Sequence, residues 1–369
     1  MVRALRQSGV DATIVSSDDD VGRRLPVPVE RWLEHEGVPT YFIRRVTSRC
    51  HTLVGFTFAP GFVPWLWREI PRQDFVHVHT VFSFPANVAM AIARRRRKPY
   101  AARPLGQLCD WSLKVRSGIK RLQLATIGRR NLDSTAFLHL TSQMEANEVA
   151  DIGLRCPVKV LPLGIQIPNE TSGCDEWLRT RLEIPNQNRI ALFLSRIHPK
   201  KGLDVLLRAL ARVRDAKIDL VICGDGDQRY VGELRQLADQ LGLGARVHWL
   251  GFVRGEEKWK IVQGCDFFVL SSYSENFGIA VLEALACGLF VIVSPNVGLA
   301  AEISTAGLGR LAAVDEAALA DAIASVAVSA NFEAAARASR RAFVEQRFSW
   351  AAATDRLIAA YEDALYCRN

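Results

Sequence analysis

Short apolar runs alternate with longer amphipathic segments along most of the chain. Strand-like runs occur in the first half at residues 12–15, 40–43, 75–78, 136–140 and 158–161. They recur in the second half at residues 190–194, 219–223, 247–250, 267–270 and 290–293. Apolar runs of this length, separated by helical segments, are typical of parallel sheets with helices on both faces. The pattern therefore predicts an α/β fold.

The segments between the runs have apolar residues at helical spacing, most clearly at residues 85–96, 119–132, 143–152, 203–213 and 230–241. Residues 162–188 instead hold three prolines and two glycines, which is typical of a linker. We expect an N-terminal Rossmann-like domain at residues 1–165, a linker at 166–188, a C-terminal Rossmann-like domain at 189–347 and a last helix at 348–369. Two such doubly wound domains would face a cleft, and ligands would bind at the C-terminal ends of their strands.

The composition indicates an ordinary globular protein that is long enough for two cores. Of the 369 residues, 49% are hydrophobic and 23% are charged. The eight cysteines are scattered, without a C-x-x-C pair or histidines at zinc spacing. No apolar run reaches the roughly 18 residues that a spanning helix needs. We therefore expect reduced thiols and a cytoplasmic location.

The charge balance is basic, with 47 lysines and arginines against 39 acidic residues. Basic residues gather at residues 94–98 and in a second set. This second set comprises Lys114, Arg116, Lys120, Arg121, Arg129 and Arg130. Both sets could contact an anionic membrane surface, which would make the protein peripheral on the inner membrane face. Alternatively, they could be solvated helix ends, where the helix dipole favours basic residues. Nucleic acid is a poorer partner, because aromatic residues are not interleaved with these charges.

Two carboxylates, Glu275 and Glu283, bracket a segment that follows a predicted strand and enters a helix-forming run. A strand-to-helix turn of a parallel sheet is where anions bind, because the first helical amides point outward and carry partial positive charge. The two acids would be separated by roughly 12 Å if Glu283 lies two turns into the helix. One could hold the hydroxyls of a sugar and the other a ribose, although a pair of glutamates is also common on a solvated helix face.

Two further loops follow predicted strands. Arg196 and Lys201 lie in the loop after residues 190–194, where they could hold phosphate oxygens or be ordinary solvated cations. After residues 219–223 comes Gly224-Asp225-Gly226, whose glycines would let the backbone approach a ligand closely. It is not a complete G-x-G-x-x-G pattern.

Taken together, these motifs resemble a known family. The order and spacing of five motifs resemble the retaining glycosyltransferases of family 4, which have the GT-B fold. These motifs are Arg196, Lys201-Gly202, Gly224-Asp225-Gly226, Gly251-Phe252-Val253 and the Glu275/Glu283 pair. The resemblance covers most of residues 190–365. The first half resembles the family's acceptor domain more loosely, and residues 348–361 resemble the last helix, which crosses back to the first domain.

The resemblance implies a role for each matching residue. Arg196 and Lys201 would hold the donor diphosphate and stabilise it as it leaves, and Glu275 would bind the transferred sugar. The donor would also contact a further set: Asn276, Phe277, Gly278, Gly224, Asp225 and Gly226. Glu283 would bind the ribose, while Phe252 and Val253 would border the base. The resemblance implies transfer of a hexosyl unit, with retention at the anomeric carbon, from a nucleotide-diphosphate sugar. We expect this protein to act on a saccharide or lipid-linked acceptor in surface polysaccharide or glycolipid synthesis. The family usually needs no metal or other cofactor.

The sequence departs from the family pattern in three places. Residues 1–9 resemble the end of the family's first helix, so the first strand and its glycine-rich loop are expected to be missing from the N-terminal domain. Leu105 stands where many relatives have a histidine that contacts the donor sugar, and Leu163 stands where asparagine is common. Two alternatives to a transferase stay open: a non-catalytic, truncated GT-B binding protein and a sugar-nucleotide epimerase on the same fold.

Overall fold

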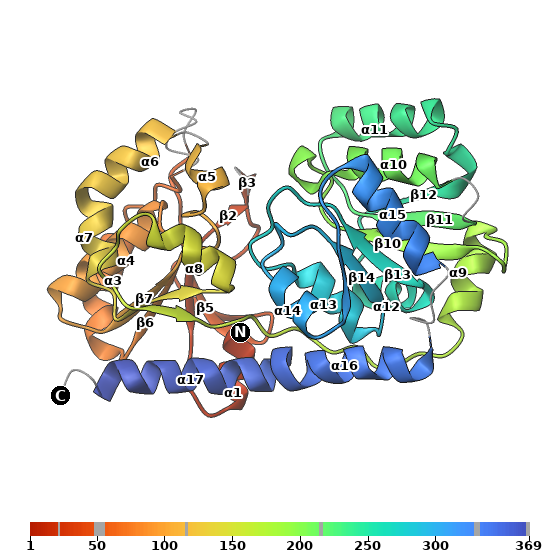
Figure 1. Cartoon of the computed structure of the whole chain (residues 1–369). Helices are drawn as coiled ribbons and strands as arrows, with labels where there is room; N and C mark the ends of the chain where they lie inside the picture. Colours follow the sequence, from red (N-terminus) through yellow and green to blue (C-terminus); the bar gives the residue numbers. More distant parts are fainter. Residues whose placement is uncertain (21–22, 48–55, 115–116, 214–216, 328–332, 367–369) are drawn as a thin grey trace. The chain divides into compact units, whose positions relative to one another are not determined.

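The computed structural model describes residues 1–20, 23–47, 56–114, 117–213, 217–327 and 333–366. Their contacts divide the chain into two compact units (Figure 1). Unit 1 comprises Met1–Gly164 together with Trp350–Asn369, and unit 2 comprises Ile165–Ser349. The mixed α/β architecture with parallel sheets agrees with the fold class that the alternating pattern predicts.

Unit 2 contains one six-stranded parallel sheet in the order β12-β11-β10-β13-β14-β15. Its strands are β10 (Arg189–Leu194), β11 (Ile218–Cys223), β12 (Val247–Gly251), β13 (Phe267–Leu270), β14 (Phe290–Val293) and β15 (Gly309–Leu311). Its helices are α9 (Cys174–Leu182), η3 (Pro199–Lys201), α10 (Leu203–Arg212), α11 (Gln228–Gln240), η4 (Gly244–Arg246), α12 (Gly255–Gly264), α13 (Ile279–Ala286), α14 (Ala300–Thr305), α15 (Glu316–Ala327) and α16 (Ala334–Phe348).

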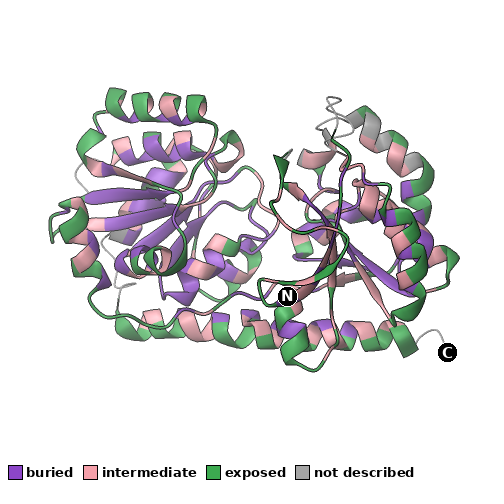
Figure 2. Ribbon diagram, turned by 180° about the vertical axis from the view of Figure 1, so that it is seen from behind, coloured by how far each residue is buried: buried purple, intermediate pink, exposed green. Residues whose placement is uncertain are grey.

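The sheet of unit 2 is doubly wound. Helices α10, α11 and α15 cover one face, while α9, α12 and α13 cover the other (Figure 1). The central strands β11, β13 and β14 are buried along their whole length, because both faces of the sheet are covered (Figure 2). This burial explains why β13 and β14 are continuous apolar runs, and why β11 is apolar apart from the buried Asp219.

Unit 1 contains a parallel four-stranded sheet, β6-β7-β8-β9, and a separate three-stranded sheet, β1-β5-β4. Its strands are β1 (Ile14–Ser17), β2 (Asp19–Asp20), β3 (Arg23–Arg24), β4 (Trp32–His35), β5 (Val38–Ile43), β6 (Val76–His79), β7 (Tyr100–Arg103), β8 (Phe137–Leu140) and β9 (Val158–Val160). Its helices are α1 (Val2–Gln7), α3 (Phe62–Glu69), η1 (Ile70–Arg72), α4 (Phe84–Arg95), α5 (Asp110–Lys114), α6 (Ser117–Gln123), η2 (Leu124–Gly128), α7 (Arg129–Asp133), α8 (Gln143–Ala150) and α17 (Trp350–Tyr366).

Within the described residues, β1 pairs only with β5, and β6 pairs only with β7. The expected absence of the family's first strand concerns this part of unit 1, and it stays a prediction. The helix expected at residues 119–132 is interrupted. Its middle is the π-helical turn η2, in which Thr126 departs from helical geometry with φ −113° and ψ −116°.

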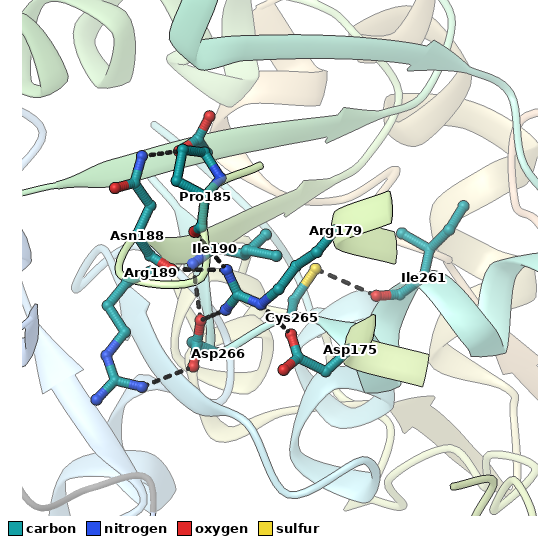
Figure 3. A network of polar contacts seen from close by, with 10 residues as sticks. Asp175, Arg179, Pro185, Asn188, Arg189, Ile190, Ile261, Cys265 and Asp266 are labelled. Atoms are coloured by element: carbon teal, nitrogen blue, oxygen red, sulfur yellow. Dashed lines mark hydrogen bonds and ion pairs between the residues drawn. The ribbon is translucent and has the colours of Figure 1, made fainter. Parts of the chain in front are cut away.

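The segment expected to be a linker, residues 166–188, contains α9, which packs on α12 within unit 2. Arg179 of α9 holds the end of this segment in place (Figure 3). Its guanidinium donates to the carbonyls of Pro185 and Asn188 and pairs with Asp175 and Asp266. Packing of the buried Cys174 and Leu178 and the hydrogen bonds of Arg179 together hold this proline-containing, polar segment on the domain.

Candidate functional site

The predicted site residues of unit 2 gather where the direction of the chain through the sheet reverses. From β10 the chain proceeds outward through β11 to β12, and it then returns to β13 on the other side of β10. The loops after β10 and β13 therefore leave neighbouring strands toward opposite faces of the sheet. In doubly wound sheets, such a switch point opens a crevice at the C-terminal ends of the strands, and ligands bind there.

Backbone hydrogen bonds join the loops at this edge. Gly224 N donates to Gly251 O at 2.7 Å, and Ile197 N donates to Asp225 O at 2.8 Å. Tyr273 N donates to Lys200 O at 2.8 Å, which ties the loop after β13 to the loop after β10. Because four loops share these bonds, the predicted donor-binding residues have one rigid backbone frame.

The glycines of the loops are needed for this close packing. A Cβ atom on Gly224 would lie 1.9 Å from the Ser195 carbonyl oxygen, and one on Gly226 would lie 2.0 Å from the Ile197 oxygen. The Asp225 carboxylate accepts from the Gly226 amide at 2.8 Å, so it stabilises its own turn. The sequence suggested that these glycines let the backbone approach a ligand closely. The structure shows a second reason for them, which is that the backbones of two loops lie very close together.

Lys201 and Glu275 form an ion pair. Lys201 ends η3 and Glu275 lies in the loop after β13, and their side chains are 13% and 23% exposed. The backbone of Glu275 is held on both sides, because its amide donates to Asn296 O and its carbonyl accepts from Gly298 N. Two of the residues that the sequence assigns to diphosphate and sugar are thus in direct contact.

The segment after Glu275 forms the start of α13. Gly278 is the N-cap of this helix, with φ +96°, a left-handed conformation that favours glycine. The first amides of a helix have no acceptor within it, so they remain donors for an anion. Phe277 points into the core and packs on Phe348 at 6.1 Å between ring centroids. Phe277 therefore anchors the turn that leads into α13, and the contacts of Asn276, Phe277 and Gly278 with a donor stay a prediction.

Glu283 is the fifth residue of α13 and thus lies just over one turn into the helix, rather than two. Its carboxylate pairs with Lys258 of α12 at 2.8 Å. The sequence analysis did not identify Lys258, because it lies in a segment of mixed charges, residues 254–260, that is typical of a solvated helix face. The only sequence signal for it is its place on the helix that precedes β13.

Arg196 is exposed, and it makes no hydrogen bond or ion pair with the residues that the structure describes. The pKa of the neighbouring His198 is lowered from its usual value, by burial first and then by the charges of Arg196, Lys200 and Lys201. The loop after β10 thus brings three cationic side chains close to His198, and their charges add to the effect of burial. Arg196 is therefore available for an anionic ligand.

Two residues of the loop after β12 differ in exposure. Phe252 is 74% exposed, and its ring is available for stacking on a base, whereas Val253 is buried. Together with Gly251, whose carbonyl accepts from Gly224, they place this loop beside the Gly224-Asp225-Gly226 turn. The sequence assigned this loop to the nucleobase, and that role stays a prediction.

Among the residues that the structure describes, no group of three or more His, Cys, Asp and Glu side chains could hold a metal ion. His77 and His79 do share one face of β6, with stacked rings 4.8 Å apart. Within the same residues, no helix combines the length and apolar character needed to cross a membrane.

Family models match both parts of the chain. The model for glycosyl transferases group 1 matches residues 175–359, which include every site residue described above. The chain belongs to this family. A second model, the glycosyl transferase 4-like domain, matches residues 1–164. The two matches together span residues 1–164 and 175–359.

Named relatives are moderately similar. The D-inositol 3-phosphate glycosyltransferase of Mycolicibacterium smegmatis is 28% identical over 311 residues, which are 83% of this chain and 65% of that protein. Its counterpart in Mycolicibacterium paratuberculosis is 32% identical over 252 residues, or 66% of this chain and 56% of that protein. The chain therefore spans less than two thirds of the length of either relative.

Solved structures share the fold. Anabaena Alr3699/HepE in complex with UDP and glucose aligns with a TM-score of 0.73 at 21% identity, over 89% of this chain and 87% of that one. The sucrose-phosphate synthase of Thermosynechococcus elongatus aligns with a TM-score of 0.75 at 20% identity, over 100% of this chain and 92% of that one. At these identities the alignments show the GT-B fold alone.

Proposed function

We propose that the protein is a retaining glycosyltransferase that moves a hexosyl unit from a nucleotide-diphosphate sugar to a saccharide or lipid-linked acceptor. The observation that carries this proposal is the arrangement at the switch point of unit 2. An available arginine, a lysine–glutamate pair and the amide end of α13 all lie on loops that share one backbone frame. This combination suits a diphosphate with a sugar attached to it. Structures of Anabaena Alr3699/HepE hold UDP or UDP-glucose, which supports a donor of this class.

In the proposed reaction, the bond between the anomeric carbon and the diphosphate oxygen breaks, and its electron pair stays on the diphosphate. The acceptor hydroxyl forms the new bond on the same face, and its proton passes to an oxygen of the leaving phosphate. Arg196, Lys201 and the α13 amides would stabilise the charge that builds on the diphosphate. Glu275 would hold sugar hydroxyls through the carboxylate oxygen that Lys201 does not contact. No cofactor is required in this scheme.

The test is a transfer assay with uridine, guanosine and adenosine diphosphohexoses and a set of sugar and lipid-linked acceptors. Arg196→Met should lower kcat/KM by about a hundredfold or more, because it removes a donor aimed at developing charge. Arg196 is exposed, so this variant should stay folded. Arg229→Met is the matched control, since Arg229 is 90% exposed on α11 and pairs only with Glu233 among the described residues.

Two results would contradict the proposal. One is wild-type turnover by a folded Arg196→Met or Glu275→Gln variant. The other is conversion of the donor to an isomeric sugar nucleotide without any acceptor, which would indicate an epimerase. The anomeric configuration of the product, measured by NMR, decides whether the transfer proceeds with retention.

We also propose that a basic face of unit 1 contacts anionic membrane lipid, where a lipid-linked acceptor would be found. Leu122 and Ile127 are 68% and 63% exposed, close in sequence to Lys120 and Arg129. Arg94 and Arg95 close α4, and the next residue, Arg96, lies over the ring of Trp67 at 3.9 Å. Of the other basic residues noted in the sequence, Arg116 lies outside the described residues, as do the side chains of Lys114 and Arg121.

Vesicle sedimentation tests this contact. We expect binding to phosphatidylglycerol vesicles, weaker binding to phosphatidylcholine, and a loss of binding on replacing Leu122 and Ile127 together by serine. Val158→Ser is the matched control, because Val158 is 44% exposed on the edge strand β9 of the same unit. Equal binding to both lipids, or no effect of the double substitution, would contradict the proposal.

A further inference from the structure

Each carboxylate of the Glu275/Glu283 pair lies against a lysine from a different element. Lys201 contacts Glu275 Oε2, and Lys258 contacts Glu283 Oε1 at 2.8 Å. Within the described residues, the other oxygen of each carboxylate accepts no hydrogen bond. Both acids thus present one oxygen that is held by a cation and one that is open to a ligand.

The Lys258–Glu283 pair is largely shielded from water. The two side chains are 20% and 17% exposed. The ammonium also lies 4.1 Å from the ring centroid of Trp259, and the face of an aromatic ring attracts a cation. An ion pair in such a place is screened weakly by solvent, so the lysine has a strong effect on the orientation of the Glu283 carboxylate.

We propose that Lys258 is a positioning residue for the ribose of a bound nucleoside diphosphate. Its ammonium fixes Glu283 through Oε1, and Oε2 is thereby directed to accept hydrogen bonds from the ribose hydroxyls. The inference rests on the proposed function, which assigns the ribose to Glu283. Lys258 itself makes no contact with the ribose in this scheme.

The geometry of the pair supports this role. A carboxylate held at one oxygen loses little further conformational freedom when the other oxygen binds a hydroxyl. Without Lys258, Glu283 would be freer to rotate, and Oε2 would be directed at the ribose less often.

A purely structural role is the competing explanation, because the pair also joins α12 to α13. A structural link would affect the stability of unit 2 and the binding of every ligand alike. A positioning residue affects only ligands that carry ribose hydroxyls. The preference for a ribonucleotide over its 2′,3′-dideoxy analogue therefore separates the two roles.

The experiment is calorimetric binding of UDP, GDP and ADP and of their 2′,3′-dideoxy counterparts. Wild type is expected to bind at least one ribonucleotide more tightly than its dideoxy form. Lys258→Met should reduce that preference by about tenfold, the usual effect of losing one hydrogen bond to a charged group. Glu283→Gln should reduce it similarly, and the double variant no further, because both act on one interaction. Lys260→Met is the matched control, since Lys260 is exposed on the same helix.

The outcomes are distinguishable. A folded Lys258→Met variant with the wild-type ribose preference overturns the inference, and so does an equal loss of ribonucleotide and dideoxynucleotide binding. If wild type binds none of the three diphosphates, the proposed function fails, and the inference fails with it. Thermal unfolding checks each variant. Should Lys258→Met not fold, Lys258→Gln keeps an N–H donor without the charge, and we expect it to lose ribose preference in the same direction.

Discussion

Gly202 has two constraints at one position. Its φ of +62° lies in the left-handed region, and a Cβ atom there would lie 2.2 Å from the Ser271 carbonyl oxygen. Ser271 Oγ donates to Gly202 O at 2.8 Å, so the two loops are already in contact on that side. The position therefore requires both the conformational freedom and the small size of glycine.

We predict that Gly202→Ala destabilises the protein more than Gly242→Ala does. Gly242 has a similar φ of +71°, but a Cβ atom there would meet nothing within 4 Å. The left-handed conformation should cost both variants roughly 1 kcal/mol. The clash in Gly202→Ala should add about 1–3 kcal/mol, the usual range for overpacking. Urea unfolding of both variants measures the difference, and equal losses would contradict the clash argument.

The residues of the site differ in how far the sequence could predict them. Lys201 and Glu275 follow neighbouring strands of a parallel sheet, so their proximity follows from topology once the strands are recognised. Lys258 follows no strand. It comes to Glu283 because α12 packs beside α13, and the face that a charged helix presents to a neighbour depends on tertiary packing.

Three arginines of α16 bind the C-terminal end of α13. Arg337, Arg340 and Arg341 donate to the carbonyls of Cys287, Gly288 and Ala286 at 3.0–3.1 Å. The last carbonyls of a helix have no intrahelical donor, and cations are favoured there by the dipole. The helix that carries Glu283 is thus fixed at the end opposite to the proposed phosphate site.

We predict that Arg340→Met lowers the free energy of unfolding by about 1–3 kcal/mol, because it leaves a buried carbonyl without its donor. Arg340 is 4% exposed, and burial, with a smaller effect of Arg337, lowers its pKa to about 10. Arg347→Met on the exposed side of α16 is the control and should cost much less. Guanidinium unfolding measures both. Equal losses of unfolding free energy in the two variants would mean that the hydrogen bond from Arg340 to Gly288 O contributes little to stability.

The apolar pattern identifies some elements of the fold and misses others. β13 and β14 lie at the predicted residues, because a strand that is buried on both faces is a continuous apolar run. The antiparallel edge strand β4 was missed, since its residues alternate between exposed and half-buried positions. The break in the helix at residues 119–132 was also missed. There Thr126 Oγ1 donates to the Leu122 carbonyl, and the apolar spacing continues through the break.

Within unit 1, residues from distant parts of the chain form one chain of hydrogen bonds. His139 Nε2 lies 2.8 Å from Leu161 O, His139 Nδ1 lies 3.3 Å from His77 Nε2, and His77 Nδ1 lies 2.6 Å from the Tyr361 hydroxyl. Because burial lowers the pKa of both histidines, each ring is neutral at pH 7 and has one donor and one acceptor nitrogen. A carbonyl only accepts, so His139 donates from Nε2 to Leu161 O, His77 donates from Nε2 to His139 Nδ1, and Tyr361 donates to His77 Nδ1. The last helix, α17, is thereby joined to β6 and β8.

This arrangement predicts that the protein loses stability as the pH falls. Burial, and then the charge of Arg103, lowers the pKa of His139 to about 3, and burial also holds the pKa of His77 well below its usual value. Between pH 6.5 and about 3 the unfolded chain therefore binds protons that the folded one does not, and the free energy of unfolding decreases with falling pH. At pH 5, the free energy of unfolding should be roughly 2 kcal/mol lower than at neutral pH through His139 alone. His139→Asn should weaken this dependence, because it removes the group that the unfolded chain protonates. Urea unfolding from pH 7.5 to 5 measures the slopes, and the same slope in wild type and His139→Asn would contradict the prediction.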